Sequence, residues 1–342
     1  MNKISFYNDY SYLAHPRILR AFEHANTEEH GTYGQDRYSQ MAADLLREKA
    51  NCDCYVQFIS GGTQSNLINI SHFLKPYESV ISCTTGHIAV NETGAIEATG
   101  HKVHTAQSTD DKLTPEHIQT ILNAHHGEHM VVPKMVYLSQ STETGSIYTR
   151  DELKNISDIC KENDLYLYID GARIASALAS PTCDFTLSDI ASFCDAFYFG
   201  GTKIGLLFGE ATVICNDKLT NHYRHSLKQR GGLLAKGASL GVQFYELLKD
   251  DLYIGLAKHA NKMASRLYDG IVSHGFTIDA PCQSNQIFVT LPTTIIEKLE
   301  ENFSFLRWAK DDNGTTIRLV TSWSTKQEDV DQFIDALGSY RD

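Results

Sequence analysis

The sequence predicts an α/β protein with a large domain built on a mostly parallel sheet and a smaller α+β domain behind it. Between residue 40 and about residue 215, short apolar segments alternate with amphipathic segments of helical period, and several of the short segments are apolar on both faces. Near residue 245 this alternation stops. Because 342 residues exceed one typical compact domain, we expect two, at 1–245 and 246–342.

The elements of the large domain follow from local pattern. Helix start signals separate the strands: Thr114 precedes Pro115 as a cap before a first-turn proline, and Thr149 with Glu152 has the spacing of a capping box. Runs of β-branched and aromatic residues predict strands. These strands are 54–60, 79–83, 101–106, 135–139, 165–170, 196–200 and 211–215.

The smaller domain is predicted from a different order of elements. A helical stripe of apolar residues ends at Gly275, strands follow near 286–291, 305–309 and 316–323, and a last helix closes the chain. The stripes of the two helices consist of Ala260, Met263, Ala264, Leu267 and Ile271, and of Val330, Phe333, Ile334 and Leu337.

Composition restricts the partners. The net charge is −12 and no Lys/Arg run occurs, so we expect no nucleic acid and no membrane as partner, and a small molecule instead. The N-terminus lacks the apolar core of a secretion signal, which indicates a cytoplasmic protein. Most of the eight cysteines lie in apolar segments typical of reduced, buried thiols. Cys52 and Cys54 have no second pair at zinc-site spacing, so no metal is expected.

Two glycine turns follow strands. In FISGGTQSNL (58–67), Gly62 and Thr63 open a helix-compatible segment, where free N–H groups favour an anion such as a phosphate; a simple turn is the alternative. In AFYFGGTKIG (196–205), Lys203 comes after a strand and a Gly-Gly-Thr turn. A lysine partly removed from water there has a lowered pKa and can form an imine with a carbonyl compound; the alternative is a lysine that reaches out to solvent.

Two further residues follow strands in the same way. Asp170 ends the apolar strand LYLYID, a position for ligand chemistry in an open α/β sheet, although it could equally cap a helix. His87 comes just after the strand SVISC, and an imidazole can stack on a flat heteroaromatic ring or move protons near neutral pH. A phosphate seat, an imine-forming lysine, a carboxylate for a ring nitrogen and a stacking ring together predict pyridoxal 5'-phosphate as cofactor.

With these motifs in place, the chain resembles the low-specificity L-threonine aldolases of the β-eliminating lyase group, which share the aspartate aminotransferase fold (type I) of the pyridoxal-phosphate-dependent transferase-like enzymes. The similar stretches run through nearly the whole sequence in the family's order. They are NDYS with AHPRIL, TYGQDRYS, SGGTQSNL, TGHIAVNETGAIEATGHKV, LSQSTETGSIY, IDGARIASAL, FYFGGTK, LKQRGGLLAKG and IRLVTSW.

The resemblance implies roles for individual residues. Catalysis would rest on Lys203 as the Schiff-base lysine, Asp170 at the pyridine nitrogen and His87 on the ring, with phosphate ligands at Gly62 and Thr63. Arg173 would contact the cofactor or the substrate, and Arg318 would hold the substrate carboxylate. Asn8 would be a further carboxylate ligand. Tyr33 resembles an active-site tyrosine that a neighbouring subunit often supplies. Lys228 and Arg230 match a basic stretch that can approach a neighbour's phosphate, and the expected assembly is a homodimer or homotetramer with shared active sites.

The function implied is retro-aldol cleavage of L-threonine, L-allo-threonine and related β-hydroxy amino acids to glycine and an aldehyde. Tyr12, Leu13 and Ile204 depart from the family pattern near the expected substrate entrance, which leaves substrate preference open. The base for the β-hydroxyl is also open between His87, another histidine and a water molecule.

Three alternatives remain. The same groups suit another pyridoxal-phosphate-dependent β-eliminating lyase acting on a different amino acid. HHGEH (125–129) contains the inverted zinc-protease pattern H-x-x-E-H, although Gly127 inside it favours a solvated helix end. A binding protein that has lost catalysis is the third.

Overall fold

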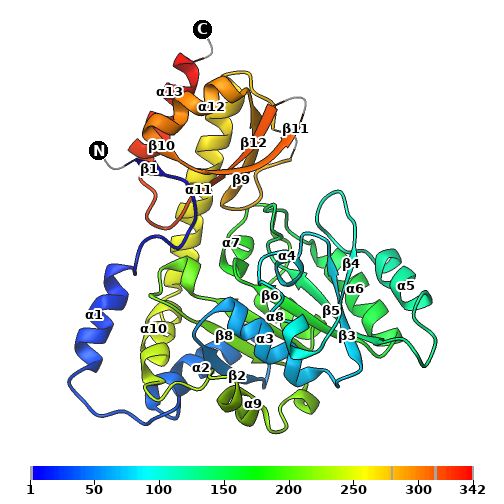
Figure 1. Ribbon diagram of the computed structural model, residues 1–342. Helices are drawn as coiled ribbons and strands as arrows, with labels where there is room; N and C mark the ends of the chain where they lie inside the picture. Colours follow the sequence, from blue (N-terminus) through cyan, green and yellow to red (C-terminus); the bar gives the residue numbers. More distant parts are fainter. Residues whose placement is uncertain (1–2, 279, 312–313, 341–342) are drawn as a thin grey trace.

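The computed structural model describes residues 3–278, 280–311 and 314–340, and its centre is a seven-stranded sheet (Figure 1). All seven predicted strands form it, in the order β2-β8-β7-β6-β5-β3-β4. Only β8 runs against its two neighbours, so the mostly parallel sheet is confirmed. The strands are β2 (Tyr55–Ile59), β3 (Glu78–Cys83), β4 (Val103–Ala106), β5 (Val132–Ser139), β6 (Tyr166–Gly171), β7 (Ala196–Gly200) and β8 (Glu210–Ile214).

Both faces of this sheet are buried, which explains the apolar character of its strands. Along β7, Phe197 and Phe199 pack into the core on one side, whereas Tyr198 packs into the core on the other. The helices of this part of the chain are α1 (Pro16–Ala25), α2 (Arg37–Ala50), α3 (Gly62–Phe73), α4 (His87–Val90), α5 (Pro115–Asn123), α6 (Arg150–Glu162), α7 (Ile174–Leu178), α8 (Leu187–Phe193), α9 (Tyr223–Gln229) and α10 (Ala238–Leu248).

The predicted helix starts are confirmed. α5 begins at Pro115 with Thr114 as its N-cap. The capping box of α6 is present, because the Glu152 amide donates to Thr149 Oγ1 at 3.2 Å and the Thr149 amide donates to Glu152 Oε2 at 2.7 Å. Residues 125–129 lie in irregular structure, a bend and a turn beyond the end of α5, so HHGEH lacks the helix that the inverted zinc pattern needs.

The C-terminal elements form a second sheet with its own core. The antiparallel strands β9 (Gln286–Leu291), β12 (Gly314–Val320) and β11 (Leu306–Asp311) and the helix α13 (Gln327–Ser339) are present as predicted, whereas α12 (Thr293–Asn302), which packs with them, was not predicted. The chain start joins them: β1 (Ile4–Ser5) pairs with β10 (Phe303–Ser304). The division at residue 245 remains a prediction.

The long helix α11 (Leu252–Ser273) runs from the large sheet to the C-terminal sheet (Figure 1). Leu256 and Ala257 near its start pack in the core of the large sheet, whereas Leu267 and Ile271 near its end pack in the C-terminal core. Within the described part of the chain, no helix combines the length and hydrophobicity required to cross a lipid bilayer.

Candidate active site

The predicted site residues lie at the carboxyl ends of neighbouring strands. Asp170 is the second-to-last residue of β6, and the sheet register places it opposite Ser139 of β5 and Tyr198 of β7. His87 opens α4 after β3, and Lys203 lies in the turn after β7. Because the carboxyl ends of parallel strands share one edge of a sheet, the chain brings these groups together.

Asp170 is a buried, ionised carboxylate. It is 3% exposed, and its oxygens accept hydrogen bonds from the Tyr137 hydroxyl at 2.6 Å, from Asn66 Nδ2 at 3.1 Å and from the Tyr198 hydroxyl. Burial alone would raise the pKa of Asp170, but the charge of His87 and these three donors outweigh it, so the pKa lies below its ordinary value. Asp170 is not the N-cap of α7, which is Arg173, but its Oδ1 also accepts from the Ala172 amide in the turn before α7, at 3.0 Å.

A buried hydrogen-bond chain connects His87 to Asp170. His87 Nδ1 lies 2.7 Å from Glu92 Oε1, the same oxygen accepts from Asn66 Nδ2 at 2.8 Å, and Asn66 Nδ2 also reaches Asp170. Burial lowers the pKa of His87. The hydrogen bond to Glu92 and the charges of Asp170 and Glu92 raise it by more, so the pKa lies above its ordinary value. His87 therefore holds its proton to a higher pH than an ordinary histidine.

Lys203 is held in its turn by a buried carboxylate. Glu210 accepts from the Gly201 amide at 2.9 Å and from Thr202 Oγ1 at 2.8 Å. Burial and the positive charge of Arg173 lower the pKa of Lys203, against the charges of nearby carboxylates. A lysine with a lowered pKa supplies more of the uncharged amine, which is the nucleophilic form.

The glycine turn after β2 leaves a helix start open. Gly61 is the N-cap of α3 and offers no side-chain cap, so the first amides of α3, including those of Gly62 and Thr63, point outward without a capping group. A Cβ added at Gly62 would stand 3.1 Å from the Tyr198 hydroxyl, the same hydroxyl that donates to Asp170. Gly62 therefore lies beside the Asp170 network.

Two arginines lie on the side of the C-terminal sheet. Arg173 donates to both oxygens of the buried Asp9, from Nε at 2.7 Å and from Nη2 at 3.0 Å. Arg318 of β12 donates weakly to the Tyr7 carbonyl at 3.4 Å, and its buried Nε has no hydrogen-bond partner among the described residues. Burial and the charge of Arg173 lower the pKa of Arg318, and the charge of Asp9 offsets this only in part, which indicates that the two arginines lie close together.

Two predicted residues are placed differently. Asn8 Oδ1 accepts from the Tyr10 amide at 3.0 Å and from Ser11 Oγ at 2.8 Å, so its side chain closes a local turn. Tyr33 has the Lys228 ammonium 4.5 Å from its ring centre, and no described contact joins it to Asp170 or Lys203. The two residues that the resemblance assigns to a neighbouring subunit thus lie together.

The three departures from the family pattern differ in exposure. Tyr12 and Leu13 are 61% and 76% exposed, and the ring of Tyr12 lies edge-on to Trp323. Ile204 is buried beside Lys203.

Arg230, of the predicted basic stretch, lies next to the start of α3. Its backbone carbonyl accepts from Gln64 Nε2 in the first turn of that helix, at 3.5 Å.

Sequence reasoning missed four carboxylates of this region. For two of them a signal existed, because Glu92 and Glu143 stand inside stretches already recognised, TGHIAVNETG and LSQSTETGSIY. Asp9 directly follows Asn8, and its burial shows that it, rather than Asn8, turns inward to an arginine. Glu210 had no sequence signal, since its contact with the Lys203 turn depends on the pairing of β7 with β8.

Comparison with known proteins agrees with this arrangement. The model of the beta-eliminating lyase family matches residues 15–294. The chain is 33% identical to the low specificity L-threonine aldolase of Pseudomonas aeruginosa and 34% identical to that of a Pseudomonas species, in each case over 92% of this chain and 91% of that protein.

Solved structures give the same result. A structure described as a threonine aldolase of Leishmania major is 48% identical, covers 98% of this chain and 99% of its own, and superposes with a TM-score of 0.97. A Thermus thermophilus aspartate aminotransferase, 13% identical over 99% of this chain and 91% of its own, has a TM-score of 0.75, which confirms the predicted fold type. This chain belongs to the beta-eliminating lyase family and, within it, stands with the threonine aldolases.

Proposed function

We propose that this protein is a lyase that uses pyridoxal 5'-phosphate to cleave L-threonine, L-allo-threonine and related β-hydroxy amino acids into glycine and an aldehyde. The observation that carries the proposal is one sheet edge that holds an amine of lowered pKa at Lys203, an ionised carboxylate at Asp170 and the ring of His87. The names of the most similar relatives support the same reaction.

The residues present fit the cofactor. The uncapped first turn of α3 suits a phosphate, and Gly62 leaves no side chain in the way. Asp170 keeps its charge although it is buried, as a partner of a protonated ring nitrogen must. Lys203 supplies an amine in the form that reacts with an aldehyde. When bound, pyridoxal phosphate supplies that aldehyde and a ring that takes up the electron pair of a broken Cα bond.

The chain's own residues then orient the substrate. The Arg318 Nε, which has no partner among the described residues, is a buried donor suited to an amino-acid carboxylate, and the charge of Arg173 acts on the same guanidinium. Holding the carboxylate fixes which Cα bond stands perpendicular to the ring, and this choice selects the bond that breaks. Asp9 anchors Arg173 from behind and so keeps the guanidinium in place.

The proposal is tested by supplying L-threonine and L-allo-threonine, alongside serine and cysteine derivatives, to the purified protein with pyridoxal phosphate. Equal amounts of glycine and acetaldehyde from the threonines are expected. Products of β-elimination from serine or cysteine derivatives, without glycine from threonine, would instead favour the alternative, another β-eliminating lyase acting on a different amino acid.

Replacing the proposed carboxylate clamp by a point charge gives a second test. Arg318→Lys is expected to raise the KM for L-threonine about 10- to 100-fold with a smaller change in kcat, because a lysine cannot make the forked pair of hydrogen bonds of an arginine. Steady-state kinetics measure both constants. Arg307→Lys, which alters an exposed pair with Glu300, is the matched control. An unchanged KM would exclude the carboxylate role of Arg318.

We also propose a homodimer or homotetramer in which Tyr33 and Lys228 serve a neighbouring subunit's site. Their mutual contact at 4.5 Å, apart from the Asp170 network, supports this.

We propose the cytoplasm as the location of the protein. The eight cysteines are all unpaired, which supports a reducing compartment.

A further inference from the structure

Glu143 lies in the loop between β5 and α6, next to the Asp170 network but outside every role assigned above. Hydrogen bonds across the loop fix its shape. Gln140 Nε2 donates to the Tyr148 carbonyl and the Tyr148 amide donates back to Gln140 Oε1, both at 3.1 Å. Thr142 Oγ1 lies 2.7 Å from Ser146 Oγ. Hydrogen bonds between Gln140 and Tyr148, and between Thr142 and Ser146, thus enclose Glu143 in the loop.

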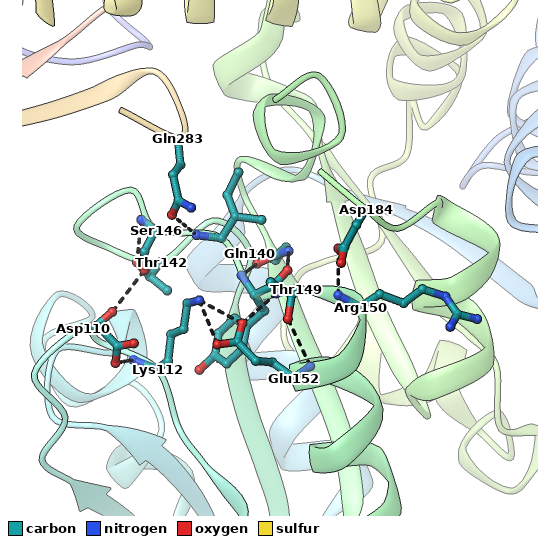
Figure 2. Close-up of polar contacts among 12 residues, drawn as sticks. Asp110, Lys112, Gln140, Thr142, Ser146, Thr149, Arg150, Glu152, Asp184 and Gln283 are labelled. Atoms are coloured by element: carbon teal, nitrogen blue, oxygen red, sulfur yellow. Dashed lines mark hydrogen bonds and ion pairs between the residues drawn. The ribbon is translucent and has the colours of Figure 1, made fainter. Parts of the chain in front are cut away.

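The same loop is tied to its surroundings on two sides (Figure 2). Ser146 Oγ donates to the Asp110 carbonyl at 3.0 Å, and Gln283 Oε1, from the segment before β9, accepts from the Ile147 amide at 3.1 Å. Gly145 has a φ of +85°, and a Cβ there would stand 2.8 Å from Ser284 Oγ. Glu143 is therefore held by a rigid support, as a group that acts on a reacting atom must be.

The two oxygens of the Glu143 carboxylate are used differently. Oε1 accepts from the His87 backbone amide at 2.9 Å and from Ser139 Oγ at 2.7 Å. Oε2 makes no hydrogen bond among the described residues and is not sealed from solvent, since Glu143 is partly exposed. One oxygen thus fixes the group, and the other is left for a ligand.

The neighbours of Glu143 mark its place in the site. Its carboxylate accepts from the His87 amide at 2.9 Å, and its charge interacts with those of Asp170 and Arg173, so it lies near the groups expected to hold the ring and the substrate carboxylate. In the proposed site, an amino acid whose carboxylate is held by the arginines and whose Cα lies beside Lys203 would have its Cβ substituents within reach of this region. The ionisable groups that act on Glu143, or on which it acts, are His87, Tyr137, Tyr148, Asp170 and Arg173.

We propose that Glu143 is the base that accepts the proton of the substrate's β-hydroxyl, through Oε2. This inference rests on the proposed function. The hydroxyl proton passes to Glu143 while the O–H electron pair becomes the second bond of the aldehyde C=O. The electron pair of the breaking Cα–Cβ bond would pass to pyridoxal phosphate, the electron acceptor of the proposed function. Cα then gains one proton to give glycine, and Glu143 returns to the carboxylate.

His87 is less suited to this step. Its Nδ1 is already hydrogen-bonded to Glu92, and its raised pKa reduces the fraction of the neutral ring, which is the form that can accept a proton. Glu143 is better matched, because burial, only partly offset by the hydrogen bond from Ser139, raises its pKa to about 7. A base whose pKa lies near the working pH is both ionised and basic enough to remove a proton.

The experiment compares two reactions of the holoenzyme. Cleavage of L-threonine needs a base for the hydroxyl, whereas exchange of the glycine α-proton with D2O needs the cofactor, Lys203 and the arginines but no such base. Glu143→Gln is expected to lower kcat for threonine about 10²- to 10⁴-fold and to leave glycine exchange and the visible absorbance of the cofactor close to wild type. Glu162→Gln, at an exposed end of α6, is the matched control and should change neither.

The pH dependence of the wild-type protein provides a second measurement that does not depend on the variant's folding. A base must be ionised, so kcat/KM for threonine should rise with pH through an ionisation near 7 that glycine exchange lacks. Three results would each overturn the assignment. The Glu143→Gln variant could cleave threonine as fast as the wild-type protein, it could lose glycine exchange to the same extent as cleavage, or the two wild-type reactions could have identical pH profiles. If the wild-type protein exchanges glycine but cleaves no threonine, the proposed function itself is what fails.

Discussion

The Lys203→Ala variant is expected to lose threonine cleavage by at least about 10³-fold and to lose the visible absorbance of bound pyridoxal phosphate. Lys203 is the amine at the carboxyl edge of the sheet whose pKa is lowered by burial and by Arg173, and Glu210 fixes the turn that carries it. Alanine removes the nucleophile but leaves the turn, because Glu210 binds the Gly201 amide and the Thr202 hydroxyl instead of the lysine side chain.

Absorbance spectra and steady-state rates of the purified proteins measure both effects. Lys161→Ala, at an exposed position near the end of α6, is the matched control and should retain colour and activity. Circular dichroism should give the same spectrum for both variants, since neither side chain lies in an apolar core. A Lys203→Ala protein that remains coloured and active would refute the assignment of the lysine.

Asp170→Asn is expected to lower kcat about 10²- to 10³-fold, since it removes the negative charge proposed to face the ring nitrogen. The substitution also replaces one carboxylate oxygen, a hydrogen-bond acceptor, by an NH2 group, which is a hydrogen-bond donor. In the native chain the carboxylate accepts from Tyr137, Tyr198 and Asn66, and an amide NH2 group must face at least one of these donors. Weaker binding of the cofactor should accompany the slower turnover.

The measurement is kcat for L-threonine together with the dissociation constant of pyridoxal phosphate. Tyr137→Phe is the graded comparison, because it removes one donor and keeps the charge; a smaller loss than for Asp170→Asn is expected. If Asp170→Asn cleaves threonine as fast as the wild-type protein, Asp170 does not hold the ring nitrogen.

The strands and the strand-end residues could be predicted because they depend on local pattern. Short runs of apolar and aromatic residues place β6 and β7, and the parallel direction of strands in an α/β sheet then puts Asp170, His87 and Lys203 at one edge. The same reasoning places the open helix start at Gly62, because a glycine turn after a strand is visible in the sequence.

The rest of the site depends on contacts between distant segments. Asn66 joins Glu92 to Asp170 across 26 and 104 residues of sequence, and Asp9 meets Arg173 across 164. Whether Asn8 or Asp9 turns inward depends on how the N-terminal segment lies against Asn285 and Arg173, which no local pattern encodes. The pairing of β1 with β10 is missed for the same reason.

The covalent link between Lys203 and the cofactor can be tested directly by borohydride reduction of the holoenzyme, followed by proteolysis and mass spectrometry of the peptides. The account predicts that the phosphopyridoxyl mass appears on the peptide that contains FYFGGTKIG, at Lys203. A label on another lysine, or a protein that takes up no pyridoxal phosphate and carries no label, would contradict it.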